Sequence, residues 1–142
     1  MELSRNFSVD ELIQTSTGLQ NIPLRPETEK LLFLANFILQ PIRDRWGKIK
    51  ITSAFRCKDV NAKVGGAKDS QHVSGEAADI IPIDADMDKV FEWIVMESGI
   101  NFGQAIRESK TGTEWIHISL PRLEKPNRQA LEYDGRGYKA YV

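Results

Sequence analysis

The chain has 142 residues, of which 19 are basic and 20 acidic, and its formal net charge is -1. This length fits one domain spanning residues 1–142, and the charge balance argues against a nucleic-acid partner held mainly through its phosphates. A single cysteine, Cys57, excludes an internal disulfide. The first ten residues lack the apolar core of a signal peptide, and no segment approaches the roughly 20 apolar residues of a membrane helix. We therefore expect synthesis in the cytoplasm and no membrane insertion.

Helical patterns dominate the first part of the chain. A short helix is predicted over 7–13, where Ser8 suits the N-cap and Glu11 would complete a capping box. The longest helix is predicted over 25–46, with a kink at Pro41 and an end at Gly47. Shorter helices are predicted over 59–64 and 84–98.

Strand patterns lie mainly in the second part. Alternating or apolar runs predict strands over 48–52, 77–81, 104–108 and 115–119, and residues 110–113 have the composition of a hairpin turn. The tail, with Leu131, Tyr138 and Tyr141, is expected to add a last hairpin at the sheet edge. The predicted fold class is α+β, with N-terminal helices packed on a small, mainly antiparallel sheet.

Two segments contain the residue types of a metal site. Residues 70–79 read SQHVSGEAAD and contain His72 and Asp79, and residues 114–117 read EWIH and contain His117. Catalytic zinc usually takes three protein ligands and leaves its fourth position to water. The only two histidines and Asp79 would supply those ligands in a cleft on the sheet. Glu114 would be the spare carboxylate that takes a proton from the water.

Each of these residues also has a plainer interpretation. Asp79 could cap a turn or accept backbone donors, and His117 could be an ordinary strand residue. Glu114 lies three residues before His117, so the two side chains point to opposite faces of a flat strand. The catalytic interpretation therefore requires a turn or a bulge that brings Glu114 round.

Other polar residues near these segments have two interpretations. Arg56 could hold a substrate carboxylate or the oxygen that becomes negative during hydrolysis, or it could form a surface ion pair with Asp59 or Glu76. Ser70 could donate to substrate or satisfy loop backbone groups. Trp115 is expected to form a wall of the cleft or part of the core, and Glu76 is expected to be a solvated loop carboxylate.

Together, the motifs resemble a zinc metallopeptidase family of peptidoglycan hydrolases with a hedgehog-like fold. The family contains D-Ala-D-Ala carboxypeptidases, D-Ala-D-Ala dipeptidases and phage L-alanyl-D-glutamate endopeptidases. Its pattern is Ser-x-His-x-x-Gly-x-Ala-x-Asp, with a later Glu-x-x-His and an upstream Ser-x-x-Arg. Residues 70–79, 114–117 and 53–56 match that pattern, and the resemblance covers roughly residues 31–119.

The resemblance implies a peptidase with one zinc ion and no covalent intermediate. Glu114 would be the general base, and Arg56 would stabilise the substrate carbonyl or carboxylate. Ser70 matches a family serine that helps to hold substrate, and Trp115 would line the substrate cleft. The implied metal ligands are His72, Asp79 and His117.

The expected function is therefore hydrolysis of a peptidoglycan stem-peptide bond by a monomer, as an L-Ala-D-Glu endopeptidase or a D-Ala-D-Ala carboxypeptidase. The short spacing of the motifs looks most like phage-encoded members, which implies an endolysin or virion-associated hydrolase acting on the cell wall. The alternative is a non-catalytic, zinc-containing module that binds wall or protein, because the hedgehog signalling domain resembles this family. Glu114 favours the enzyme, since a purely structural site needs no spare carboxylate.

Overall fold

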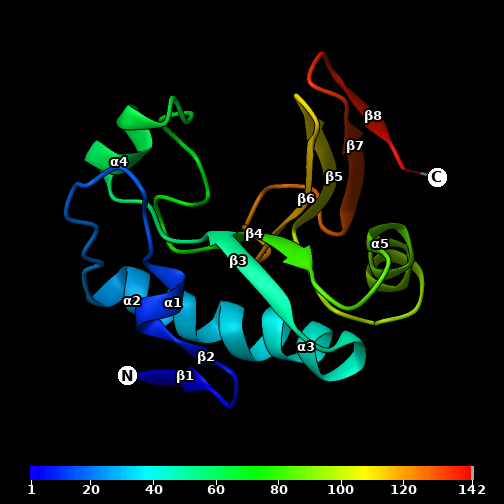
Figure 1. The fold of residues 1–142 in the computed structure, drawn as a ribbon, viewed down its shortest axis with the longest axis horizontal. Coiled ribbons are helices and arrows are strands. Elements are labelled where there is room, and N and C mark those ends of the chain that lie inside the picture. Colours follow the sequence, from blue (N-terminus) through cyan, green and yellow to red (C-terminus); the bar gives the residue numbers. More distant parts are fainter. Residues whose placement is uncertain (142) are drawn as a thin grey trace.

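Helices pack against one face of a six-stranded sheet in the computed structural model, which describes residues 1–141 (Figure 1). The sheet has the strand order β3-β4-β6-β5-β7-β8. Its strands are β3 (Ile49–Ser53), β4 (Ala77–Pro82), β5 (Gln104–Lys110), β6 (Thr113–Ser119), β7 (Gln129–Tyr133) and β8 (Tyr138–Ala140). Neighbouring strands are antiparallel except β5 and β7, which are parallel, so the expected α+β class with a mainly antiparallel sheet is confirmed.

The N-terminal segment begins with a small hairpin and not with the helix predicted over 7–13. Strands β1 (Glu2–Ser4) and β2 (Phe7–Ser8) pair first, and helix α1 (Val9–Leu12) follows. Ser8 is the N-cap, and its Oγ accepts the backbone N–H of Glu11 at 3.3 Å. Residues 7 and 8 pair with β1 because the buried Phe7 and Leu3 side chains both join the core.

The long helix predicted over 25–46 is present in three parts. Helix α2 (Arg25–Leu34) continues into a π-helical turn, η1 (Ala35–Leu39), and then into α3 (Gln40–Trp46). Pro41 has no N–H to donate to the preceding turn, and the wider turn lies directly before it. The chain leaves α3 at Gly47, which has a φ of 82° and ends the helix as predicted.

The other helices are α4 (Lys58–Lys63) and α5 (Met87–Met96). Helix α5 is shorter than the predicted 84–98 because the Asp86 side chain accepts the Lys89 N–H at 3.0 Å and caps the helix there. Helix α5 contacts α3 and three strands, whereas α4 lies beside the loop that leads to β4 (Figure 1).

The sheet therefore has one apolar face and one polar face. Ile80, Ile116 and Ile118 are fully buried and join the helices in a single hydrophobic cluster. Side chains alternate along a strand, so Asp79 and His117 lie on the opposite face. The residues from α4 to β4 pass over that second face, and the candidate site lies there.

Candidate metal centre

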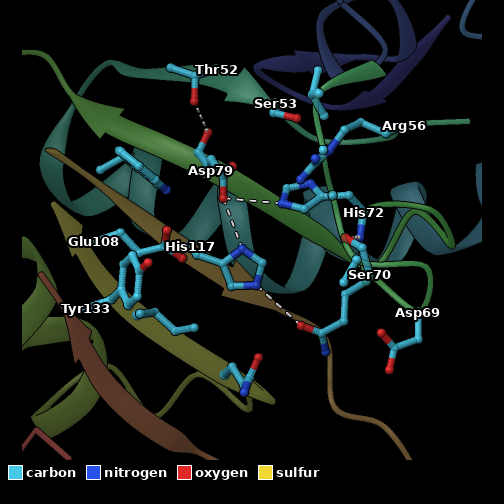
Figure 2. A pocket seen from close by; sticks show the side chains of 18 of the residues that line it. Thr52, Ser53, Arg56, Asp69, Ser70, His72, Asp79, Glu108, His117 and Tyr133 are labelled. Atoms are coloured by element: carbon cyan, nitrogen blue, oxygen red, sulfur yellow. Dashed lines mark hydrogen bonds and ion pairs between the residues drawn. The ribbon is translucent and has the colours of Figure 1, made fainter. Parts of the chain in front are cut away.

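His72, Asp79 and His117 meet on the polar face of the sheet, although the sequence separates them widely. Asp79 on β4 is the register partner of His117 on the neighbouring strand β6. His72 comes from the loop between α4 and β4 and points at the same place (Figure 2). One nitrogen or oxygen from each of the three side chains lies within 4.8 Å of the others.

The spacing of these atoms fits a zinc ion. Asp79 Oδ1 lies 3.0 Å from His117 Nδ1 and 3.4 Å from His72 Nε2. In a tetrahedral site with metal–ligand distances of about 2.0–2.1 Å, neighbouring ligand atoms are about 3.3–3.4 Å apart. Two imidazoles and one carboxylate are also ligands that zinc prefers. The three residues could therefore hold a metal ion, as the sequence predicted.

The backbone fixes the orientation of the His72 ring. His72 is only 3% exposed, and its Nδ1 lies 2.7 Å from the carbonyl oxygen of Ala54. A carbonyl can only accept, so Nδ1 carries a proton and Nε2 is the nitrogen that faces Asp79. The neighbouring Arg56 N–H donates to the His72 carbonyl at 3.0 Å, which ties the loop to the end of β3.

Asp79 is held as a carboxylate between the two histidines. Burial alone would raise its pKa, but the charge and hydrogen bonds of His72 and His117 outweigh burial and hold the pKa well below its usual range. An ionised Asp79 would attract a bound cation, which would replace the positive charge that the histidines carry when they are protonated.

Arg56 and Ser70 both line the groove beside these three residues (Figure 2). Burial lowers the pKa of Arg56, while the carboxylates of Asp79 and Glu108 oppose that shift. Within residues 1–141, the buried Nε of Arg56 has no hydrogen-bond acceptor. Ser70 Oγ accepts the His72 N–H at 3.2 Å and so shapes the loop. Of the two interpretations of Arg56, the surface ion pair with Asp59 or Glu76 is wrong, because the side chain lies in the groove.

Glu114 does not reach the metal centre, because neither the turn nor a bulge brings it round to the face of His117. Pairing between β5 and β6 is regular from Ala105–Ile118 to Lys110–Thr113. Glu114 therefore faces away from His117, and its Oε1 accepts from Arg107 Nη2 at 3.3 Å. Its side chain is 52% exposed on the opposite face.

Glu108 occupies the place that the sequence analysis assigned to Glu114. It pairs with Trp115 across β5 and β6, on the same face as His117 (Figure 2). Burial raises the pKa of Glu108, as does the nearby Asp79, while His117, Arg56 and Lys110 lower it. The side chain of Glu108 lines the same groove as the three candidate ligands.

The groove around these residues has a volume of about 910 Å³. The loop after α4 forms one side, with Gly65, Gly66 and Asp69, and the C-terminal hairpin forms the other. The strand register places an aromatic row beside Glu108, in the order Trp115, Glu108, Tyr133 and Tyr138. Trp115 is therefore part of the wall of the groove and not of the core.

The groove holds three residues that could bind a metal ion, together with a further carboxylate and an arginine, which is the arrangement of a metal-dependent hydrolase. The sequence model of the family described as Peptidase M15 matches residues 5–119 of the chain. The chain belongs to this family of zinc metallopeptidases, so it is a metallopeptidase. No match is found among curated proteins. Among the described residues, no helix is long and apolar enough to cross a membrane.

Proposed function

We propose that the protein is a zinc-dependent peptidase that hydrolyses a stem-peptide bond of bacterial peptidoglycan. The observation that carries this proposal is the convergence of His72, Asp79 and His117 with a carboxylate and an arginine in one groove. Membership of the peptidase M15 family and the match to the motifs of peptidoglycan hydrolases support the substrate class.

The three candidate ligands would hold one zinc ion. Such an ion would lower the pKa of a bound water and polarise the carbonyl of the substrate. Glu108 accepts the proton of the attacking water and passes it to the departing amine, so that peptide and water become a carboxylate and a free amine. Burial suits Glu108 to this role because it raises the pKa toward the working range of a general base.

Arg56 is the cation available to the reacting carbonyl. Its side chain lines the same groove as His72 and Asp79, so its charge can stabilise the oxygen that becomes negative during hydrolysis. Ser70 shapes the loop through the His72 N–H and presents its hydroxyl to the groove.

An endopeptidase fits the groove better than a carboxypeptidase does. The lining continues from Gly65 and Gly66 on one side of the candidate ligands to Tyr133 and Tyr138 on the other. A peptide chain can therefore extend in both directions from the reacting bond, whereas a carboxypeptidase must enclose a chain terminus. The resemblance to short phage-encoded members supports a role as an endolysin or a virion-associated wall hydrolase.

Digestion of purified peptidoglycan tests this function. We expect the zinc-loaded protein to release new amino termini, chelation to abolish the release, and zinc to restore it. Mass spectrometry of the products identifies the bond, and cleavage between L-Ala and D-Glu would support the endopeptidase. Binding to the wall without any chelator-sensitive cleavage would refute the peptidase and favour a non-catalytic module.

A further inference from the structure

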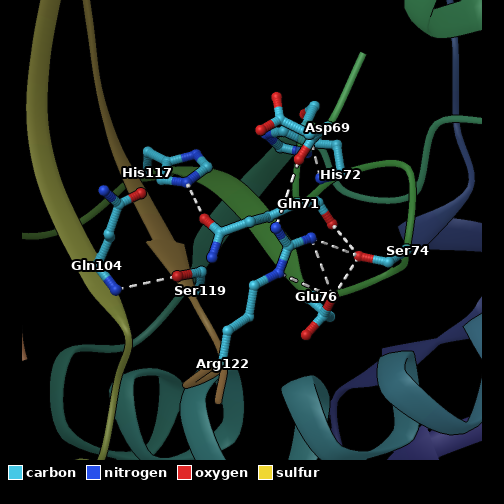
Figure 3. A network of polar contacts seen from close by, with 10 residues as sticks. Asp69, Gln71, His72, Ser74, Glu76, Gln104, His117, Ser119 and Arg122 are labelled. Carbon is cyan, nitrogen blue, oxygen red and sulfur yellow. Dashed lines mark hydrogen bonds and ion pairs between the residues drawn. The ribbon is translucent and has the colours of Figure 1, made fainter. Parts of the chain in front are cut away.

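The ring of His117 has a partner on the side away from Asp79. Nδ1 of His117 faces Asp79 Oδ1 at 3.0 Å, while Nε2 lies 3.3 Å from the side-chain oxygen of Gln71 (Figure 3). Gln71 is the residue before His72, so one loop supplies both a candidate ligand and the contact to the other histidine.

This contact gives Nε2 of His117 a hydrogen-bond acceptor when Nδ1 faces a metal ion. Asp79 Oδ1 and the amide oxygen of Gln71 are both acceptors, so without a metal each ring nitrogen of His117 faces an acceptor. Once a metal ion takes the lone pair of Nδ1, the ring proton must lie on Nε2, where the Gln71 oxygen accepts it. The Ala54 carbonyl does the reverse for His72, where it selects Nε2 as the free nitrogen. With a metal ion in place, the two histidines would therefore be in opposite tautomers, His72 bound through Nε2 and His117 through Nδ1.

An ion pair inside the fold holds the loop that carries Gln71. Arg122, which follows β6, donates to Glu76 Oε1 from Nε at 3.2 Å and from Nη2 at 3.1 Å (Figure 3). Nη2 also donates to Ser74 Oγ at 3.1 Å, and Nη1 donates to the Asp69 carbonyl at 3.4 Å. Glu76 is 8% exposed, so the expectation of a solvated carboxylate is wrong.

The network reaches Gln71 through its backbone. The Ser74 hydroxyl donates to the Gln71 carbonyl at 3.1 Å, and the Glu76 N–H donates to the same oxygen at 3.0 Å. Ser74 Oγ also lies close to Glu76 Oε1, so its single proton lies between two acceptors. Two donors thus hold the Gln71 carbonyl, which fixes the backbone from which its side chain extends.

We propose that Gln71, fixed by the Arg122–Glu76 ion pair, is a positioning residue that directs Nδ1 of His117 to the metal ion. The proposal rests on the zinc binding proposed above. It adds that metal affinity depends on a residue that touches no metal. Partners of this kind orient a ligand ring, and their loss typically costs about 10–100-fold in metal affinity.

Zinc affinity of the purified full chain, measured by competition with a chromogenic chelator, tests this role. We expect Gln71→Leu to weaken zinc binding about 10–100-fold and Gln71→Glu, which keeps an acceptor at Nε2, to retain most of it. The matched control is Gln104→Leu, because Gln104 lines the same groove but its amide donates to Gln129 Oε1 at 2.9 Å. Equal affinities of Gln71→Leu and wild type would overturn the proposal.

The tautomer itself can be read by nitrogen-15 NMR of the zinc-loaded wild-type chain, which has only two histidines. We expect one ring protonated on Nδ1 and the other, His117, protonated on Nε2. A proton on Nδ1 of His117 in the loaded protein would overturn the proposal even if Gln71→Leu failed to fold. Wild-type protein that binds no zinc would instead refute the metal site on which the proposal rests.

A double-mutant cycle tests the anchoring by Arg122. If Arg122→Met acts through Gln71, its effect on zinc affinity should be largely absent when Gln71 is already leucine. Additive effects of the two substitutions would show that the ion pair does not act through Gln71.

Discussion

Glu108 and Glu114 can be exchanged for glutamine one at a time, and the two variants should differ sharply in turnover. The substitution keeps the size of the side chain and removes its ability to accept a proton. We expect Glu108→Gln to lose most of its kcat and to bind zinc as the wild type does. Glu114→Gln should keep both kcat and zinc affinity.

The magnitudes follow from the positions of the two side chains. Glu108 is a diagonal neighbour of His117 on the same face of an antiparallel pair, at about 7–8 Å between Cα atoms, so its carboxylate can reach a water beside the metal ligands. Losing a general base costs about 10²- to 10⁴-fold, or about 3–5 kcal/mol of activation free energy. Glu114 is half exposed and pairs with Arg107, so its loss costs at most about 1 kcal/mol of stability.

The assay is the initial rate of peptide-bond cleavage in purified muropeptides, followed by chromatography at saturating substrate. Zinc affinity and circular dichroism of each variant separate a chemical defect from a lost metal or a lost fold. A fully active Glu108→Gln together with an inactive Glu114→Gln would refute the assignment drawn from the strand register. Two active variants would exclude both carboxylates as the general base.

Three other properties should respond to single substitutions. Burial raises the pKa of Glu108, so the folded protein holds this proton more tightly than the unfolded chain does. The stabilisation is fully present below the unfolded pKa of about 4.3 and is lost as pH rises through the folded value. Urea unfolding of the metal-free proteins should therefore show Glu108→Gln gaining stability over wild type between about pH 4 and pH 7, and an unchanged difference would contradict the burial of this carboxyl. Tyr138→Ala should raise KM for muropeptides several-fold with little change in kcat because Tyr138 lines the groove, whereas Phe37→Ala, an equally exposed aromatic residue outside the groove, should leave KM unchanged. Gly75→Ala should lower the free energy of unfolding by more than about 1–2 kcal/mol, since φ is +76° and an added Cβ would lie 2.6 Å from a carbonyl oxygen of α2. Gly18→Ala shares the positive φ but has open space around it, so a loss as large as that of Gly75→Ala would show that strain alone is responsible.

Local patterns were sufficient to predict most of the elements. Alternation in 48–52 and 115–119 and the caps at Ser8 and Gly47 all appear in the structure. The π-helical turn before Pro41 was not predicted, because the sequence states only that a hydrogen bond is missing and not how the helix adjusts. The parallel pairing of β7 with β5 was also missed, since it joins segments separated by a hairpin and a long connection.

For the site, residue types identified the candidate metal ligands. The strand register, which would have located Glu108, was not used. His72 and His117 were identified because they are the only histidines of the chain and each lies beside a candidate carboxylate. Asp79 was identified because a carboxylate in an apolar run is costly unless it is paired or bound to a metal. Glu108 was missed although Thr111 and Gly112 mark a two-residue turn, which would have allowed the pairs to be counted back to Glu108–Trp115. The contact of Gln71 with His117 depends on a loop conformation that no local pattern encodes.

A spare carboxylate favours an enzyme over a binding module, and in the structure that carboxylate belongs to Glu108 and not to Glu114. Glu114 gave the enzyme its spare carboxylate, but it lies on the outer face and pairs with Arg107. Glu108 supplies the carboxylate instead, with a raised pKa and a position beside His117. A structural zinc site would gain nothing from a carboxyl group whose burial raises its pKa, because ionising such a group at neutral pH lowers the stability of the fold. The cost that Glu108 imposes on stability is therefore the feature that a catalytic role explains and a binding role does not.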